Sequence, residues 1–450
     1  MVLLQCPCCC YTQNQQQQQK TQPHSHDQIH SESSTSSSLS SQPSLPSVPS
    51  LTSQQSQSTH HKLLTTINGH SSPISSLALH SKFLFSGSSN SEIRRFDKDP
   101  FALQASNNIN NLVAISNGSK STIKSMIVVN DMLFSAHQDH KIRVWKIETT
   151  MTSNSTNQEQ KLFKCIATLP TFNDRFSKLF SSKNYVEVRR HKKYTWVNHI
   201  DAVSSLAVSK DGLFLYSASW DRTFKIWRVS DFKCLESVKN AHEDAINAIV
   251  VSSSGVVYTG SADRKIKIWK KKNHEEDEKM KSKSKKKKHF LVGTLEKHKS
   301  AVNALALNKD GSVLYSGACD RSILVWEKSN SIIRNCSGLD QDPDDENMVL
   351  VGALRGHTKA ILCLVVMDDL VCSGSADNSV RLWKRGIDAK SYACLAVLQG
   401  HRKAVKCLAI ADDSKSGKNG GVDDNGSSYL VYSGSLDCDI KVWQIRVPLI

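Results

Sequence analysis

The chain has 450 residues, and its 58 Lys and Arg against 42 Asp and Glu give a formal net charge of +16. With 39% hydrophobic residues it has enough apolar side chains for a sizeable core, while the absence of any run of about 18 apolar residues excludes a membrane-spanning helix. The excess of positive charge raises a nucleic-acid-binding hypothesis, because basic surfaces attract phosphate. That hypothesis depends on where the charge lies.

The first 61 residues differ in composition from the rest of the chain. A glutamine run, Gln15–Gln19, precedes a Ser-rich tract that has too few apolar residues to form a core, so we expect residues 1–61 to be a disordered tail. Met1–Cys6 lacks the basic flank and the length of a secretory signal, so we expect cytoplasmic or nuclear localisation and reduced thiols. The cysteines at its start are interpreted as a reduced disordered tip, with lipidation and metal binding as less favoured alternatives: Cys6, Cys8, Cys9 and Cys10.

From residue 62 onward one pattern recurs. Six copies have an Asp six residues before a Trp and a hydroxyl residue ten residues before it, and five of these also have a preceding His. The second copy has Ser135, Asp139 and Trp145 but Ser119 where the His is expected, and the first copy has Ser86, Asn90 and Phe96. The sequence therefore predicts seven structural repeats. The five complete sets are His199, Ser217, Asp221, Trp227; His242, Thr259, Asp263, Trp269; His298, Ser316, Asp320, Trp326; His357, Ser373, Asp377, Trp383; and His401, Ser433, Asp437, Trp443.

Each copy resembles a WD40 repeat, the four-stranded blade of a β-propeller, although the Asp that normally follows the Trp is missing in every copy. The resemblance implies an all-β, seven-bladed WD40 β-propeller over residues 62–450. An apolar strand is predicted before each His position, the first over residues 62–67, and the chain ends soon after Trp443 without a fourth strand for the last blade. We therefore expect the N-terminal strand to close the ring, which leaves few open sheet edges.

Each complete set contains Ser or Thr, His and Asp, as hydrolase sites do. An enzyme needs one such site, so repetition in five copies favours a structural hydrogen-bonded network instead. There is no Gly-rich phosphate loop, closely spaced metal-ligand set or paired-carboxylate motif. The sequence predicts a protein without catalytic activity, cofactor or metal.

Insertions between the predicted strands are the candidate binding regions, because loops on a rigid scaffold often carry function. They cover residues 171–197, 271–289, 329–348 and 411–428. We expect 171–197 to start and end on the face that carries the His and Asp positions, and the other three to lie on the opposite face. On the first face the candidate partner-binding residues are Gln138, Asp201, Trp220, Asp244, Lys359, Lys403 and Leu436.

Trp220 is the sharpest of these candidates, because it is not the repeat Trp and an exposed Trp is a common interaction hot spot. The alternative is that the 171–197 segment packs over it through Phe176, Phe180, Tyr185 or Trp196.

The basic excess is concentrated in two segments, 171–197 and 270–288, which are predicted to leave opposite faces, so a single phosphate-binding groove is not expected. The lysines at 281–288 are interpreted as a solvated loop, as a nuclear-import signal formed by Lys285, Lys286, Lys287 and Lys288, or as a nucleic-acid contact. No aromatic residues interleave them to stack on bases, which weakens the last interpretation.

Several segments are more specific than a generic repeat: His137–Ile147, Val188–Val208, Ser219–Val238, Ser316–Glu327 and Val351–Leu364. On these the chain resembles the plant JINGUBANG-like WD40 proteins. The resemblance implies a non-enzymatic regulator of plant development, acting in pollen germination and tube growth through protein partners such as transcription factors.

Two other functions stay open. The first, a substrate receptor of a cullin-type ubiquitin ligase, requires an acidic residue after the Trp and an Arg three residues after it, and here only Glu327 follows a Trp while Ser329 takes the Arg position. The second is a nucleic-acid-associated nuclear protein.

Overall fold

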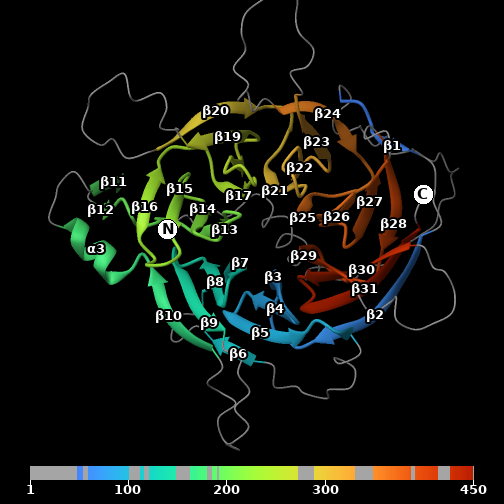
Figure 1. The fold of residues 1–450 in the computed structure, drawn as a ribbon, viewed down its shortest axis with the longest axis horizontal. Coiled ribbons are helices and arrows are strands. Elements are labelled where there is room, and N and C mark those ends of the chain that lie inside the picture. The colour runs from blue at the N-terminus through green and yellow to red at the C-terminus, as the bar shows by residue number, and fades with distance from the viewer. Residues whose placement is uncertain are drawn as a thin grey trace, which may run out of the picture.

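The computed structural model describes residues 48–53, 59–100, 112–115, 121–147, 163–179, 185–189, 192–271, 288–329, 348–386, 391–413 and 426–448. Within them, seven antiparallel β-sheets are arranged as blades around a central axis (Figure 1). This confirms the seven-bladed β-propeller predicted from the repeats.

Each blade contributes four strands in order from the axis outward. Blade 1 consists of β3 (Ile74–His80), β4 (Phe83–Ser88), β5 (Glu92–Asp97) and β6 (Leu112–Ile115). Blade 2 consists of β7 (Ile123–Val129), β8 (Met132–His137), β9 (Ile142–Ile147) and β10 (Phe163–Leu169). Blade 3 consists of β13 (Val203–Val208), β14 (Phe214–Ser219), β15 (Phe224–Arg228) and β16 (Cys234–Val238).

The later blades repeat this order. Blade 4 consists of β17 (Ile246–Val251), β18 (Val257–Ser261), β19 (Ile266–Lys271) and β20 (His289–Leu295). Blade 5 consists of β21 (Val302–Leu307), β22 (Val313–Ala318), β23 (Ile323–Lys328) and β24 (Met348–Leu354). Blade 6 consists of β25 (Ile361–Met367), β26 (Leu370–Ser375), β27 (Val380–Arg385) and β28 (Tyr392–Leu398).

Blade 7 closes the ring by joining both ends of the propeller. Its inner strands are β29 (Val405–Asp412), β30 (Gly426–Ser435) and β31 (Asp439–Pro448), and its outer strand is β2 (His60–Asn68). β2 pairs antiparallel with β31, with Leu63 opposite Trp443. The expected closure by an N-terminal strand is thus present, and the strand begins at His60.

The inner strands also join neighbouring blades. In each one the register with the second strand shifts at its start, which leaves one residue bulged out of the ladder. At this position, Asn247 donates to the carbonyl of Val302 in blade 5 (3.1 Å), and Asn303 donates to that of Ile361 in blade 6 (2.8 Å). The bulges therefore carry polar bonds across the apolar interfaces between sheets.

A short segment of the N-terminal tail lies against the propeller. β1 (Thr52–Ser53) pairs in parallel with β28, so the sheet of blade 6 has five strands. Val48 is 5% exposed and joins the core cluster of blades 4 and 5. The expectation that the whole of 1–61 is a disordered tail is therefore wrong for residues 48–53, because Val48 and Leu51 find apolar surface on the outer strands. Residues 1–47 lie outside the described ranges.

The insertion between blades 2 and 3 contains α3 (Phe172–Leu179), β11 (Tyr185–Arg189) and β12 (Lys192–Thr195). The buried carboxylate of Asp174 accepts a hydrogen bond from the amide of Cys234 (2.7 Å), at the start of β16. α3 therefore lies at the outer edge of blade 3, as Figure 1 shows. The insertion starts and ends on the face with the His and Asp positions, as expected, because Pro170 and Asn198 line one cavity with Asp139 and His199. Between these ends, the buried Asp174 holds α3 at the outer strand.

Candidate functional site

In five blades the His, hydroxyl, Asp and Trp predicted from the repeat lie together. His Nε2 lies 2.8 Å from the hydroxyl oxygen in all five blades. The Trp indole N–H donates to the same oxygen at 2.8–3.0 Å. His Nδ1 lies 2.8–3.2 Å from the Asp carboxylate. One chain of hydrogen bonds therefore connects the second and third strands and two turns in each blade.

The direction of these bonds follows from the chemistry of the groups. The ionised carboxylate can only accept, so Nδ1 carries the proton and Nε2 accepts from the hydroxyl. Burial raises the pKa of Asp263, but the hydrogen bond and charge of His242 and the amides of Lys265 and Glu243 outweigh this and lower it to about 2. In blade 3, burial lowers the pKa of His199 in spite of the neighbouring Asp221. In blade 3 this favours a carboxylate beside a neutral imidazole.

These sets differ from hydrolase sites in their accessibility. The five hydroxyl residues are all 0% exposed, and the five His residues are buried: Ser217, Thr259, Ser316, Ser373, Ser433; His199, His242, His298, His357, His401. A nucleophile must reach its substrate, and each of these oxygens already accepts an indole proton between packed strands. The geometry supports the structural interpretation of the repeated set.

Blade 2 builds the network from a residue that the repeat pattern did not identify. His137, at the end of β8, is 0% exposed and its Nε2 lies 2.8 Å from the Ser135 hydroxyl, which also accepts from Trp145. Asp139 instead pairs with Arg143 (2.6 Å). The sequence signal for this replacement was a His two residues after the network Ser.

Blade 1 has a less complete network. His70 Nε2 lies 2.6 Å from the Ser86 hydroxyl, and Glu92 takes the acidic position at 3.5 Å from His70 Nδ1. Burial and the Arg94 charge lower the pKa of His70 to about 4. Phe96 is buried but has no N–H to donate, so one bond of the chain is lost.

We call the face that carries the turns before the inner strands and the turns containing the network Asp the His–Asp face. The predicted residues after each His occupy equivalent backbone positions there. The carbonyls of Asp201, Asp244, Lys359 and Lys403 each accept from a buried Ser hydroxyl at 2.9–3.1 Å. All four therefore stand at the same level on a rigid rim.

The residues before the turn Asp are also equivalent. The amides of Gln138, Trp220 and Leu436 donate to carbonyls of the preceding turns at 2.9, 3.0 and 3.0 Å. Gln138 is exposed, and Trp220 and Leu436 are half-buried. The structure therefore brings all seven candidate partner-binding residues to one face.

Trp220 contacts the neighbouring blade through a cation. Lys124 is the bulged residue of β7, and its Nζ lies 4.9 Å from the centre of the Trp220 ring. Phe176 stacks on Phe172 in α3 at 5.8 Å, and both rings are largely exposed. Trp196 packs against the core of blades 2 and 3, whereas Phe180 and the side chain of Tyr185 lie outside the described residues.

The turns after the network His differ in charge from blade to blade. In blades 3 and 4 the turns after the network His carry acids: Asp201, Glu243 and Asp244. In blades 5, 6 and 7 the same turns carry bases: Lys299, Lys359, Arg402 and Lys403. All but the half-buried Asp201 are exposed. The turns that contain the network Asp add the exposed Arg222 and Arg264 in blades 3 and 4, so both signs of charge occur on this face, which favours a partner with both signs of charge.

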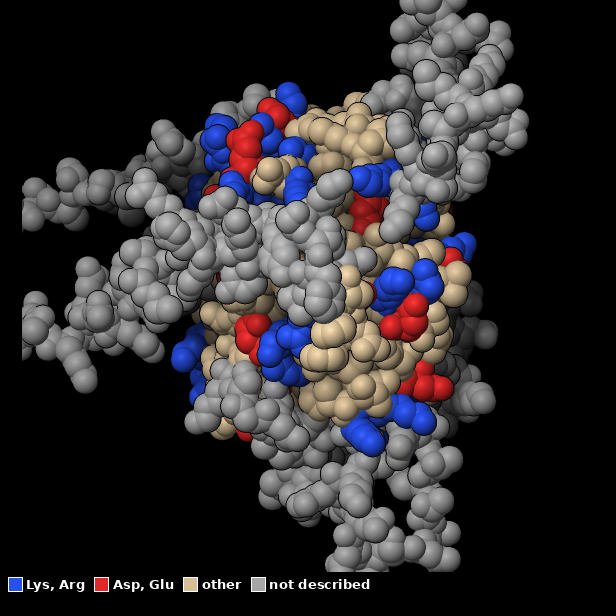
Figure 2. Space-filling view, turned by 90° about the vertical axis from the view of Figure 1, so that its left-hand side faces the viewer, with Lys and Arg blue, Asp and Glu red and all other residues tan. Residues whose placement is uncertain are grey.

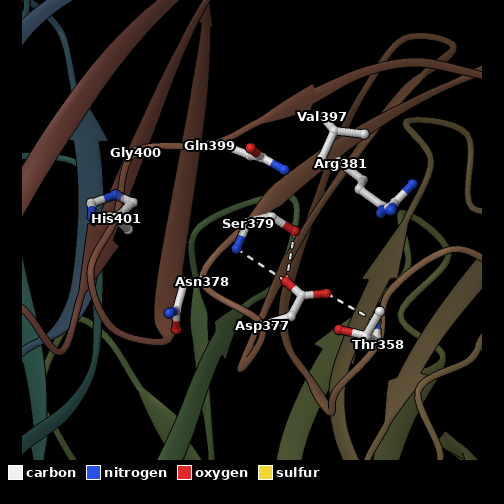
Figure 3. Close-up of a pocket in the computed structure, with 9 residues that line it drawn as sticks. All are labelled: Thr358, Asp377, Asn378, Ser379, Arg381, Val397, Gln399, Gly400 and His401. Carbon is white, nitrogen blue, oxygen red and sulfur yellow. Dashed lines mark hydrogen bonds between the residues drawn. The ribbon is translucent and has the colours of Figure 1, made fainter. Parts of the chain in front are cut away.

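A cavity of about 330 Å³ opens between blades 6 and 7 on this face (Figure 3). Its walls include Arg381, Gln399 and His401. The Asp377 carboxylate in it already accepts from the Thr358 amide (3.0 Å), the Ser379 amide (3.0 Å) and the Ser379 hydroxyl (2.6 Å). Its oxygens hold two turns in place.

Most of the basic segment 270–288 lies outside the described residues. Figure 2 shows separate groups of Lys and Arg interspersed with Asp and Glu on the side that it presents. Lys288 is exposed, while Lys285, Lys286 and Lys287 lie outside the described residues, as do Cys6, Cys8, Cys9 and Cys10. The insertions predicted at 271–289, 329–348 and 411–428 also lie largely outside these ranges.

The described residues include eight cysteines. Seven cysteines there are free thiols, which agrees with the expected reduced state, whereas Cys319 is disulfide-bonded and departs from it. The described ranges contain no cluster of three metal-ligating side chains. They also contain no helix with the length and apolar character needed to cross a membrane.

Comparisons with known proteins agree with the architecture. The family described as "WD domain, G-beta repeat" matches residues 61–97, 190–228, 232–270, 290–327, 348–384 and 392–444, which together exceed half of the chain. Blade 2, with its relocated His137, lies outside these matches.

Curated relatives share parts of the chain. "Protein HIRA" of Zea mays is 32% identical over 31% of this chain, and "Mitochondrial division protein 1" of Schizosaccharomyces pombe is 26% identical over 47%. "Protein HIRA" of Oryza sativa is also 32% identical over 31%. The chain spans 14–33% of the length of these relatives. The extent of the family match and the seven-bladed ring show that the chain belongs to the WD40 repeat family.

Proposed function

We propose that this protein is a non-enzymatic scaffold that binds other proteins through its His–Asp face. The observation that carries this proposal is the rigid rim on which Trp220 stands between the acidic turns of blades 3 and 4 and the exposed Gln138 of blade 2. A half-buried Trp held by a cation offers a large contact area with little loss of side-chain freedom on binding. The hydroxyls of the five networks are buried and cannot reach a substrate as nucleophiles, which favours a role of this face in binding rather than in covalent catalysis.

The finer proposal follows the resemblance to the JINGUBANG-like proteins. The protein would act in the cytoplasm, the nucleus or both, as a regulator of plant development in pollen germination and tube growth, with transcription factors as partners. Two of the relatives given above are plant proteins, which is compatible with a plant source. Lipidation of the N-terminal cysteines is not part of the proposal.

Affinity purification of the full chain from plant tissue tests the scaffold proposal. Trp220→Ala is expected to lose partners that wild type retains, whereas Phe172→Ala, which removes an exposed aromatic ring from α3, should keep them. An unchanged partner set with Trp220→Ala would reject the His–Asp face as the binding surface. Both variants should melt like wild type, because neither side chain belongs to the buried core.

Charge reversal provides an independent test. Asp244→Lys and Lys403→Glu are expected to slow association with the same partners, because both side chains are exposed charges on the His–Asp face. Added salt should reduce the difference between each variant and wild type. If each variant associated at the wild-type rate in low salt, a role for the Asp244 and Lys403 charges in binding would be contradicted.

The ubiquitin-ligase alternative loses further support in the structure. Glu327, the acidic residue that follows a repeat Trp, forms an ion pair with Arg385 of blade 6. It therefore links two blades instead of presenting its carboxylate to an adaptor.

The nuclear-import and nucleic-acid hypotheses are tested by replacing Lys285–Lys288 with Ala. A fluorescent fusion that leaves the nucleus after this change would support an import signal. RNA or DNA affinity that falls steeply with salt and disappears in the same variant would support direct nucleic-acid binding instead.

A further inference from the structure

Residues 48–53, which we call the seam segment, cross the boundary between the outer strands of blades 5 and 6. The Ala353 amide in β24 donates to the Pro49 carbonyl (2.9 Å), and the Leu51 amide donates to the Ala353 carbonyl (3.0 Å). On the other side of the same residue, the Tyr392 amide in β28 donates to the Leu51 carbonyl (2.9 Å). The segment thus pairs with two edge strands in succession, as an added β-strand does.

Two apolar side chains of the seam segment enter the propeller. Val48 packs with Met348 and Ala353 in the core cluster that includes Trp326. Leu51 packs against the next cluster, which contains Tyr392 and Leu354. The two side chains are three residues apart and enter neighbouring apolar cores. The outer strands therefore bind both the backbone and the apolar side chains of the seam segment.

Polar contacts set the ends of the segment. Arg355 directly follows β24, and its Nη2 donates to the Val48 carbonyl (2.6 Å) while its amide donates to the Thr52 hydroxyl (3.2 Å). A hydroxyl residue directly after the second apolar side chain therefore completes the match. These contacts do not involve an ionised group of the segment.

The absence of a side chain at Gly352 leaves room for the seam segment. A Cβ added at Gly352 would lie 2.6 Å from Leu51 Cγ and 2.9 Å from the Pro49 carbonyl oxygen, and the latter is backbone that cannot rotate away. Gly293 occupies the same position in the outer strand of blade 4, and a Cβ there would meet only Ile268 Cδ1 at 3.7 Å. The missing side chain at Gly352 thus opens a slot that the seam segment fills.

We propose that the seam between β24 and β28 is a strand-addition site for an extended segment of a partner protein, and that residues 48–53 occupy it in cis. The partner segment carries two apolar side chains three residues apart, followed by Ser or Thr, and adds its backbone to β24 and then β28. This deepens the proposed scaffold function, on which it rests, by naming a second surface and the chemistry of its ligand.

The cis occupant is suited to displacement. It buries two apolar side chains and forms three backbone bonds with the outer strands, and against this stands the entropy lost in ordering six residues. Because these contributions oppose each other, we expect docking in cis to be weaker than the packing of the blade strands. Its tether to β2 supplies a high local concentration, so a competing segment gains access when the tail is pulled away or altered.

The test uses the full chain and a fluorescein-labelled peptide of residues 44–56. In the variant Val48→Asp/Leu51→Asp, two carboxylates replace the buried side chains and release the seam segment. We expect the peptide to bind this variant at least about tenfold more tightly than wild type, whose seam is filled at the tether's effective concentration. Fluorescence anisotropy gives the Kd, and far-UV circular dichroism checks that each variant is folded.

Matched glycine variants then locate the peptide. Adding Gly352→Val to the released variant should weaken peptide binding at least about tenfold, whereas adding Gly293→Val should leave the Kd within about twofold. No binding to the folded released variant, or equal binding with Gly352→Val, would overturn the proposal. A concentration-dependent dimer of wild type that Gly352→Val abolishes would also overturn it, in favour of tail exchange between copies.

The peptide titration needs no cellular partner and leaves Trp220 untouched. Failure of the seam proposal is therefore distinguishable from failure of the scaffold proposal, which the partner purification tests on the other surface.

Discussion

Removing one carboxylate of the repeated network should destabilise the whole propeller. In blade 4 the Asp263 side chain is 4% exposed and accepts from His242 Nδ1 (2.8 Å), the Glu243 amide (3.1 Å) and the Lys265 amide (2.9 Å). In Asp263→Ala the two amides lie near the surface and regain water, but the His242 N–H stays buried without an acceptor. The lost bonds and this orphaned donor together cost about 3 kcal/mol of unfolding free energy.

Urea denaturation followed by tryptophan fluorescence measures this loss. Asp244→Ala is the matched control, because Asp244 lies one residue from Glu243 in the same blade, is exposed, and accepts only the adjacent Ala245 amide among the described residues. It should change the unfolding free energy by less than about 0.5 kcal/mol. Equal destabilisation by both substitutions would refute the argument that the buried network, rather than acidic charge in this turn, stabilises the blade.

Other outcomes follow from the same structure. Because the pKa of Asp263 is about 2 in the folded chain and ordinarily 3.8, its stabilising effect is present above about pH 4 and is lost as the pH falls towards 2; Asp263→Asn should therefore show a flatter acid-unfolding curve than wild type, and parallel curves would contradict this. His137→Ala should cost about 1–3 kcal/mol in urea unfolding although blade 2 lacks the expected His, while the exposed Gln138→Ala serves as its neutral control. Deleting residues 60–68 leaves β31 as an open edge and should lower the Tm far more than deleting residues 1–47, and equal melting would disprove closure by β2.

The repeat spacing was sufficient to predict the blades. An offset of ten residues places the hydroxyl opposite the Trp indole on paired strands, and an offset of six places the Asp in the turn between them, so each blade's network depends on short-range geometry. The same offsets predicted the number of blades. The apolar runs before the His positions, together with the resemblance to WD40 repeats, predicted the outer strand supplied by the N-terminus. They did not predict His137, because the imidazole that replaces the missing His comes from within the strand and not from the preceding turn.

The sequence by itself determined which side chains form the networks of blades 3 to 7, because these partners lie within one blade and their spacing recurs. Only the tertiary structure decided which contacts form between blades and between the blades and the segments outside them. Lys124 reaches Trp220 across a blade boundary, α3 lies at an outer edge through Asp174, and Thr52 bonds to Arg355, 303 residues later in the chain. The low-complexity composition of residues 48–53 did not predict that they dock. Their docking depends on the slot at Gly352, which exists only when blades 5 and 6 stand side by side.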